Sequence, residues 1–302
     1  MLISITKMIA NYQCWSVLIR VNQRSIVFLV IKICEASCDS WFKKYVVFKE
    51  INIMGNSSQK SDERKVALIT GSAKNIGRAI ALSLSQEQIN VVVHYNRSRE
   101  SAEEVLSEVK RNDVDGLVVQ ADVTKYEDVE RMFKEIYSYF GRLDILVNNV
   151  GNFLYKDTLN ISVNEWNEII NSNLNSTFYC CKLAVESMIK NKYGRIINIG
   201  ASSCDKVKAY QYVVPYYVAK TGILILTQSL AVPLAKYNIT VNMISPGIVK
   251  DNEVTNEDDV KHMPSGRFAK FEDIVNAVKF LISDKSDYIT GTNIGVSGGW
   301  NI

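Results

Sequence analysis

The sequence has little proline, little histidine and no long uncharged stretch. Its 302 residues include 4 prolines and 2 histidines, which excludes collagen-like and mucin-like chains and argues against a histidine-rich metal site. The longest runs without a charged residue, 221–235 and 288–302, have 15 residues each, whereas a membrane-spanning helix needs roughly 20 apolar residues. The 6 cysteines form no CxxC pair, which is typical of a reducing compartment. These absences predict a cytoplasmic protein with no metal site and no membrane span.

The net charge of +3 belongs to the first part of the chain. Residues 1–53 hold 7 Lys and Arg against 3 Asp and Glu, whereas residues 54–302 hold 28 against 29. Because residues 54–302 are nearly neutral, they have no excess of positive charge that would attract nucleic acid, and no nucleic-acid partner is expected. Hydrophobic residues make up 47% of the chain and charged residues 22%, which is the composition of an ordinary globular protein.

Residues 1–60 differ in pattern from the rest of the chain. The hydrophobic stretch 25–31 is flanked by Arg24 and Lys32, so this segment lacks the uninterrupted core and the cleavage site of a secretory signal. We interpret 1–60 as an N-terminal appendage or linker, either disordered or produced by a mis-assigned start, because Met54 stands where the next domain would begin. The alternative is a small helical or membrane-associating extension. The sequence does not decide between them.

From residue 61 onward, strand and helix patterns alternate. Apolar, β-branched runs predict strands at 65–70, 91–95, 116–120, 144–148, 195–199, 240–244 and 293–296. The stretches between them have helical length and a 3.6-residue apolar spacing. Such alternation predicts a parallel sheet covered by helices on both faces. The expected fold class is α/β, with a single doubly wound, Rossmann-type domain over 61–302 and a mainly parallel seven-stranded sheet.

A glycine-containing turn directly follows the first predicted strand of this domain. Gly71 permits a tight turn, and Gly77 lets the next helix pack closely on the sheet. The unpaired N–H groups at the start of that helix would face a pyrophosphate. The predicted nucleotide-binding residues of this turn are Gly71, Ser72, Lys74, Asn75, Ile76 and Gly77.

The end of the second predicted strand indicates which nucleotide would bind. A site specific for NAD carries an acidic residue here for the ribose 2′-hydroxyl. This chain has Asn96, Arg97 and Ser98 instead, with no acid. A guanidinium beside a hydroxyl suits a 2′-phosphate, and Lys74 could add a second charge. The sequence therefore favours NADP(H) over NAD.

Two Tyr-x-x-x-Lys pairs occur, Tyr45/Lys49 and Tyr216/Lys220. This spacing places both side chains on one helix face, where an ammonium would lower the phenol pKa from about 10 towards working pH. We interpret the first pair as accidental because it precedes the nucleotide turn. The second pair follows the fifth predicted strand, where open α/β sheets bind ligands. Tyr216 is therefore the predicted general acid or base.

Several short motifs follow one another across about 240 residues. They are Thr70-Gly-x-x-x-Asn-Ile-Gly77, Asn148-Asn149-Val150-Gly151, Tyr216-x-x-x-Lys220, Pro246-Gly247 and the glycine-rich segment 288–300. In this order and spacing, the chain resembles the short-chain dehydrogenase/reductase family, especially its 3-oxoacyl-[acyl-carrier-protein] reductase-like branch. The resemblance implies an NADP(H)-dependent oxidoreductase that reduces a carbonyl to an alcohol, or the reverse. It also implies a homodimer or homotetramer formed through the helices around 162–192 and 217–236 and through the C-terminal strand.

The resemblance implies roles for particular residues. Tyr216 would transfer the proton, Lys220 would lower its pKa and hold the nicotinamide ribose, and Asn173 would anchor a water of the proton relay. Asp122 would meet the adenine. Purely structural alternatives are that Asn173 caps or kinks a helix and that Asp122 closes a turn. The implied cofactor cleft would also include Val123, Asn149, Gly151, Pro246, Gly247 and Ile248.

The chain departs from the family pattern at several positions, of which the catalytic serine matters most. Gapless matching from the fifth strand puts Ala201 there, whereas counting 13 residues back from Tyr216 gives Ser203. Ser202 and Ser203 are therefore equal candidates. The other departures are Asn75 in place of a glycine, Val150 in place of an alanine, Asp251 in place of a threonine, and Pro233, which should kink the helix that carries Tyr216.

Three functions remain open at this point. The first is reduction of a 3-oxoacyl thioester or similar small-molecule carbonyl, and the second is a pteridine-reductase-like activity. The third is a catalytically silent family member that binds the nucleotide. The segment 248–264 has five acidic residues and is expected to be a mobile lid that determines the substrate. The sequence does not identify that substrate.

Overall fold

The computed structural model describes residues 3–10, 12–19, 28–29, 50–51, 63–250 and 257–301. Contacts divide the chain into two units, Met1–Glu63 and Arg64–Ile302. In the first unit, β1 (Ile3–Ala10) pairs antiparallel with β2 (Tyr12–Ile19), and β3 (Phe28–Leu29) pairs antiparallel with β4 (Glu50–Ile51). Apart from Glu63, the described residues of this unit lie in these four strands. The interpretation of residues 1–60, with its helical or membrane-associating alternative, stays a prediction. The pair Tyr45/Lys49 lies outside the described residues.

The second unit is built on a seven-stranded sheet. Its order is β11-β10-β9-β8-β5-β6-β7, and every neighbouring pair is parallel. The strand order reverses between β5 and β8, which is the switch point where doubly wound sheets bind ligands. All seven predicted strands are confirmed: β5 (Val66–Ile69), β6 (Asn90–Tyr95), β7 (Gly116–Gln120), β8 (Ile145–Asn148), β9 (Gly194–Ile199), β10 (Ile239–Pro246) and β11 (Asn293–Val296).

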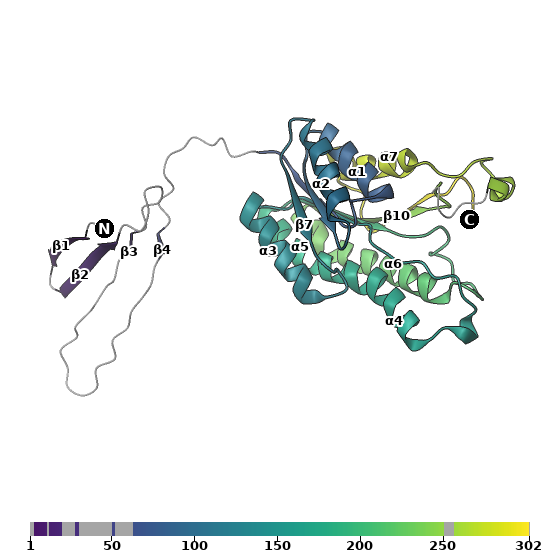
Figure 1. Cartoon of the computed structure of the whole chain (residues 1–302), viewed down its shortest axis with the longest axis horizontal. Helices are drawn as coiled ribbons and strands as arrows, with labels where there is room; N and C mark the ends of the chain where they lie inside the picture. The colour runs from purple at the N-terminus through teal and green to yellow at the C-terminus, as the bar shows by residue number, and fades with distance from the viewer. Residues whose placement is uncertain are drawn as a thin grey trace. The chain divides into compact units, whose positions relative to one another are not determined.

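Helices cover both faces of this sheet (Figure 1). One apolar layer forms under α1 (Asn75–Gln86), α2 (Arg99–Lys110) and α7 (Phe271–Ile282). The other forms under α3 (Tyr126–Phe140), α5 (Ser176–Asn191) and α6 (Val214–Leu234). Strands β5 and β6 are buried along their whole length, as expected for strands packed on both faces.

A π-helical segment interrupts the long helical stretch that crosses the second face. Helix α4 (Val163–Ile170) begins with a capping box between Ser162 and Glu165 and leads directly into the segment Asn171–Asn175, which continues as α5. Segments of this kind occur mostly at functional sites. Asn173 lies at the centre of it, and its side-chain nitrogen donates to the Ile169 carbonyl at 3.0 Å.

Helix α6 and the following turn, Val214–Tyr237, are long and apolar enough to cross a membrane by length and composition. The helix packs against β10 and buries Ile223, Ala231 and Leu234. It ends one residue after Pro233, and a 3₁₀ turn, Ala235–Tyr237, follows. Because core helices of globular proteins have the same length and composition, we interpret α6 as a core helix of this domain.

Candidate active site

The turn between β5 and α1 is shaped by two glycines. Gly71 has a φ of +66°, which favours glycine. A Cβ at Gly77 would lie 2.4 Å from the carbonyl oxygen of Gly71 and 2.8 Å from the side chain of Asn149, so no side chain fits there. The first turn of α1 contains no acidic residue, which leaves its N-terminus suited to an anion.

Asn75, which stands where the family has a glycine, adopts a φ of +47°. Asparagine tolerates this left-handed conformation better than most residues, because its short polar side chain can bond locally. The departure from the glycine pattern therefore leaves the shape of the turn intact.

Sequence reasoning missed His94, which links the turn to two strands. Its Nδ1 accepts the N–H of Gly71 at 2.9 Å, so its proton resides on Nε2, 3.1 Å from the Ala121 carbonyl oxygen. The Ser72 hydroxyl accepts the His94 N–H at 2.9 Å and is buried. Ser72, predicted to bind the cofactor, thus directs its side chain to β6. Burial lowers the pKa of His94 to about 4.

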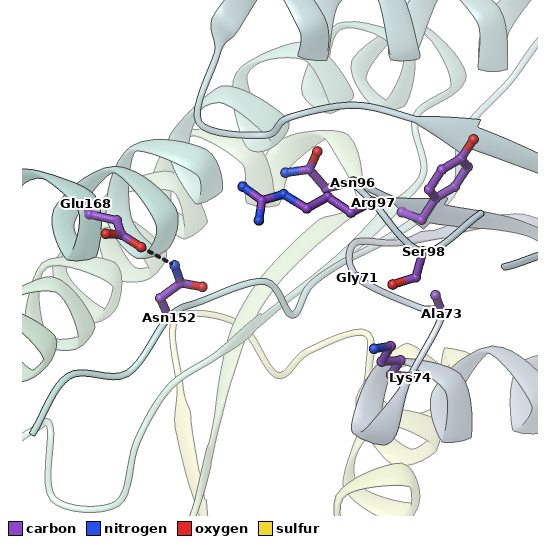
Figure 2. Close-up of a pocket in the computed structure, with 9 residues that line it drawn as sticks. Gly71, Ala73, Lys74, Asn96, Arg97, Ser98, Asn152 and Glu168 are labelled. Carbon is purple, nitrogen blue, oxygen red and sulfur yellow. Dashed lines mark hydrogen bonds between the residues drawn. The ribbon is translucent and has the colours of Figure 1, made fainter. Parts of the chain in front are cut away.

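A cavity of about 420 Å³ opens beside this turn. Figure 2 shows that the side chains of Arg97 and Lys74 reach into it from the end of β6 and the start of α1. On the opposite wall, the Asn152 amide donates to the Glu168 carboxylate at 2.9 Å. The remaining lining residues are Gly71, Ala73, Tyr95, Asn96 and Ser98. Five of the predicted nucleotide-binding residues therefore share one cavity.

Two predicted cofactor residues mainly hold neighbouring backbone. The Asp122 carboxylate accepts the Thr124 N–H at 3.1 Å and the Thr124 hydroxyl at 2.7 Å, so it closes a turn, as the structural alternative supposed. Burial opposes its charge, but these bonds and Lys125 lower the pKa of Asp122. Asn149 donates through its side chain to the Thr70 carbonyl at 2.9 Å. Val123, also predicted to bind the cofactor, is buried in the core.

Tyr216 and Lys220 lie one turn apart near the start of α6. The Lys220 ammonium is 5.4 Å from the centre of the Tyr216 ring and donates to the Ile199 carbonyl at 2.8 Å. Burial lowers the pKa of Lys220 to about 8. Burial also raises the pKa of the Tyr216 phenol. Loss of hydration therefore outweighs the ammonium at this distance in the protein alone. The predicted role of Lys220 in lowering the phenol pKa stays a prediction.

Asn173, Gly151 and Lys220 converge beside Tyr216. A Cβ at Gly151 would lie 2.2 Å from Oδ1 of Asn173 and 3.3 Å from Nζ of Lys220, so only glycine fits between them. The Asn173 side-chain nitrogen donates to the Asn152 carbonyl at 2.9 Å. Its Oδ1 is buried and has no hydrogen-bond partner among the described residues. A buried, unpaired acceptor of this kind requires a donor such as a water molecule.

The two candidate serines differ in the structure. The Ser202 hydroxyl donates to the Trp300 carbonyl at 2.6 Å. Ser203 has a φ of +68°, and its hydroxyl is buried without a partner in the described part of the chain. Strained backbone and unpaired buried groups are features of functional sites. These two observations favour Ser203 over Ser202.

The end of β10 leads into the predicted lid. The Gly247 N–H donates to the Val296 carbonyl at 3.0 Å, and the Ile248 carbonyl accepts the Ala269 N–H at 2.9 Å, so this edge of the predicted cleft, with Pro246, is fixed by backbone bonds. Asp251 and Glu253 lie outside the described residues. Within the described ranges, no three His, Cys, Asp or Glu side chains gather to hold a metal ion.

Aromatic residues that the sequence did not indicate pair with one another in the loops beside the start of α6. The Phe153 ring meets Tyr216 edge to face at 5.0 Å, and Tyr155 stacks on Tyr212 at 5.1 Å. Tyr217, the residue after Tyr216, stacks on Tyr210 at 3.9 Å. Phe153 and Tyr155 lie in the loop after β8, far in sequence from Tyr212 and Tyr216, so the fold brings these two pairs together.

Known proteins of one family match the second unit of the chain over almost its whole length. The family described as Enoyl-(Acyl carrier protein) reductase matches residues 71–301. The 3-oxoacyl-[acyl-carrier-protein] reductase FabG of Staphylococcus aureus is 41% identical over 243 residues, covering 78% of this chain and 97% of the relative. A 3-oxoacyl-[acyl-carrier-protein] reductase of Synechocystis is 34% identical over 241 residues, with 78% and 96% covered.

A solved structure supports the same fold. A crystal structure assigned to a short-chain alcohol dehydrogenase from Sinorhizobium meliloti superimposes with a TM-score of 0.73 at 30% identity. The match covers 78% of this chain and 96% of that one.

Proposed function

Because the chain belongs to the short-chain dehydrogenase/reductase family of oxidoreductases, we propose that it is an NADP(H)-dependent reductase of small-molecule carbonyls. The relatives named above support 3-oxoacyl thioesters as substrates. The family acts on the C=O and CH–OH pair. The choice of NADP(H) and of substrate are the parts of this proposal that need testing.

The observation that carries the choice of cofactor is the charge around the 420 Å³ cavity. Lys74 and Arg97 line it, and no carboxylate stands at the end of β6. The carboxylate on the facing wall, Glu168, is already engaged by the Asn152 amide. Two cations beside a helix N-terminus fit the 2′-phosphate and the pyrophosphate of NADP(H).

The bound nicotinamide would supply or accept the hydride. Tyr216 would hold the proton that moves to the carbonyl oxygen, since its raised pKa keeps the phenol protonated at neutral pH. Below pH 8, Lys220 would carry a positive charge that stabilises the phenolate left after transfer. The unpaired Oδ1 of Asn173 would hold a water close to Lys220.

We also propose that the protein forms homodimers or homotetramers. Val218, Ile225 and Val232 recur every seven residues along α6 and are exposed, as is Phe178 on α5. Seven-residue spacing places the three side chains on one stripe of the helix, where a second helix pair could pack. Light scattering would show whether the particle is larger than one chain of 34.1 kDa. Cytoplasmic localisation stays a prediction.

The experiment that tests the cofactor proposal compares NADPH and NADH binding to wild type and Arg97→Ala. Charge-assisted bonds to the 2′-phosphate are worth about 10- to 150-fold in affinity. We expect the dissociation constant for NADPH to rise by that factor, nearer the lower end because Lys74 shares the phosphate. The constant for NADH should barely change. Arg111→Ala, at the exposed end of α2, is the matched control.

Two results would contradict this proposal. One is a wild-type protein that binds NADH more tightly than NADPH. The other is an Arg97→Ala variant that weakens both cofactors equally. A protein that binds NADPH but oxidises it neither with carbonyl compounds such as acetoacetyl-coenzyme A nor with a pterin such as 7,8-dihydrobiopterin would be the silent family member considered from the sequence.

A further inference from the structure

Three exposed aromatic rings lie in the two loops that flank the proposed proton donor, the loop after β8 and the loop before α6. Phe153 is 58% exposed, Tyr155 is 69% exposed and Tyr212 is 38% exposed. Large apolar side chains gathered on the surface mark interaction sites more often than scattered ones do. Phe153 contacts the ring of Tyr216 directly, so a ligand that packs on Phe153 lies next to the proposed proton donor.

The loops that carry these rings are held together. The Lys156 N–H donates to the Tyr212 carbonyl at 2.7 Å, and the Thr158 N–H donates to the Gln211 carbonyl at 2.9 Å. The Gln211 side chain adds a bond to Asp157 at 3.0 Å. These bonds join the loop after β8 to the loop before α6. The rings therefore form a preorganised wall.

The residues next to Phe153 and Tyr216 are also held by hydrogen bonds. The carbonyl of Asn152, the residue before Phe153, accepts the Asn173 amide at 2.9 Å. On the other side, the Tyr217 hydroxyl donates to the Ser202 carbonyl at 3.2 Å, and its ring packs at 86° against Tyr216. A surface that is already ordered binds without a further entropic cost for its own side chains.

The ring angles indicate the shape of the occupant. Phe153 and Tyr216 stand at 84°, whereas Tyr155 and Tyr212 are within 13° of parallel. A flat aromatic group in the corner between Phe153 and Tyr216 can stack on one ring and meet the other edge to face, the two arrangements that aromatic pairs prefer. A flexible alkyl chain gains only contact area and loses rotamer freedom.

We propose that Phe153, Tyr155 and Tyr212 form a subsite for a planar aromatic or conjugated ring attached to the reacting carbonyl. This inference rests on the proposed carbonyl reduction and specifies its substrate class. Among the substrates considered above, it favours ring-bearing carbonyl compounds over carrier-bound linear 3-oxoacyl chains. The three residues determine specificity, and Tyr216 remains the proposed proton donor.

The test uses two 3-oxo esters that differ only in one ring, ethyl benzoylacetate and ethyl (cyclohexanecarbonyl)acetate. Calorimetry in the presence of NADP⁺ gives their affinities, and NADPH oxidation at 340 nm gives kcat/KM. Each aromatic contact is worth about two- to tenfold. We expect wild type to bind the phenyl ester at least about fivefold more tightly than the cyclohexyl ester.

The variants Tyr155→Leu and Tyr212→Leu should each lower the phenyl-to-cyclohexyl ratio, in affinity and in kcat/KM, by about two- to tenfold. The rings that pack against Tyr216 are those of Phe153 and Tyr217, so a lower ratio in these variants reports the subsite. Comparing ratios also cancels the different intrinsic reactivity of the two ketones. Tyr139→Leu, an exposed tyrosine on α3, should leave the ratio unchanged.

Equal affinities for the two esters in wild type, or unchanged ratios in both variants, would overturn the subsite. Failure of the proposed function looks different: the phenyl ester would bind preferentially and yet no ester would be reduced. A loss of preference with normal reduction of both esters would overturn the subsite alone.

Discussion

The buried imidazole of His94 makes the stability of the nucleotide turn depend on pH. The side chain is 1% exposed, and its Nδ1 accepts the Gly71 N–H. A second proton on Nδ1 would face this N–H group and would have to be buried as a charge. Burial accordingly lowers the pKa of His94 from 6.5 to about 4.

This pKa shift makes the folded protein less stable at acidic pH. The folded state favours the neutral imidazole. The free energy of unfolding is therefore highest above the unfolded pKa of about 6.5 and decreases as pH falls towards 4. Between pH 7.5 and pH 5.0, the free energy of unfolding should fall by about 2 kcal/mol on account of this group alone. Other titrating groups add their own pH dependence, which a variant must subtract.

The variant His94→Asn separates the contribution of His94 from that of the other titrating groups. Its Oδ1 can still accept the Gly71 N–H, but it has no proton to gain and it loses the bond to the Ala121 carbonyl. We expect the variant to be about 1–3 kcal/mol less stable at pH 7.5. The gap should narrow by about 2 kcal/mol at pH 5.0, because only wild type carries the penalty.

Urea unfolding followed by circular dichroism at the two pH values measures this difference. His262 is the only other histidine in the chain, and His262→Asn is the matched control. The reasoning would be refuted if wild type and His94→Asn lost the same stability, within about 0.5 kcal/mol, between the two pH values.

The remaining predictions concern the site and the N-terminal segment. The rate of carbonyl reduction should fall as pH rises through about 8, where Lys220 loses the charge that stabilises the Tyr216 phenolate; a rate that climbs steadily to pH 9.5 would contradict this role. Ser203→Ala should lower kcat by about 100- to 1,000-fold and Ser202→Ala by much less, since the Ser202 hydroxyl is bonded to Trp300 whereas that of Ser203 has no partner among the described residues. The reverse ranking would identify Ser202 instead. Removal of residues 1–53 should leave solubility, particle size and activity unchanged, and an insoluble or inactive product would show that the segment is structural.

The sequence predicted those parts of the fold that local pattern controls. The seven strands, their alternation with helices and the glycine turn all follow from apolar runs and spacing. The order of the strands confirms the doubly wound sheet. Lys74 and Arg97, predicted from two separate segments, line one cavity, because the carboxyl ends of β5 and β6 lie side by side.

Features that depend on burial or on distant contacts could not be predicted. The pKa of Tyr216 is controlled by lost hydration, which spacing along a helix does not reveal. His94 looks like an ordinary strand residue until the Gly71 N–H is placed beside it. Likewise, Tyr155 and Tyr212 stack only because backbone bonds join their two loops.

The most direct test of the proposed chemistry is the rate at which Tyr216→Phe oxidises NADPH with its carbonyl substrate under single-turnover conditions. The substitution keeps a ring against Phe153 and removes only the hydroxyl. We predict a rate about 100- to 10,000-fold below wild type, with an NADPH dissociation constant within about threefold of wild type. A variant that retains more than a tenth of the wild-type rate would contradict the proposal that Tyr216 delivers the proton.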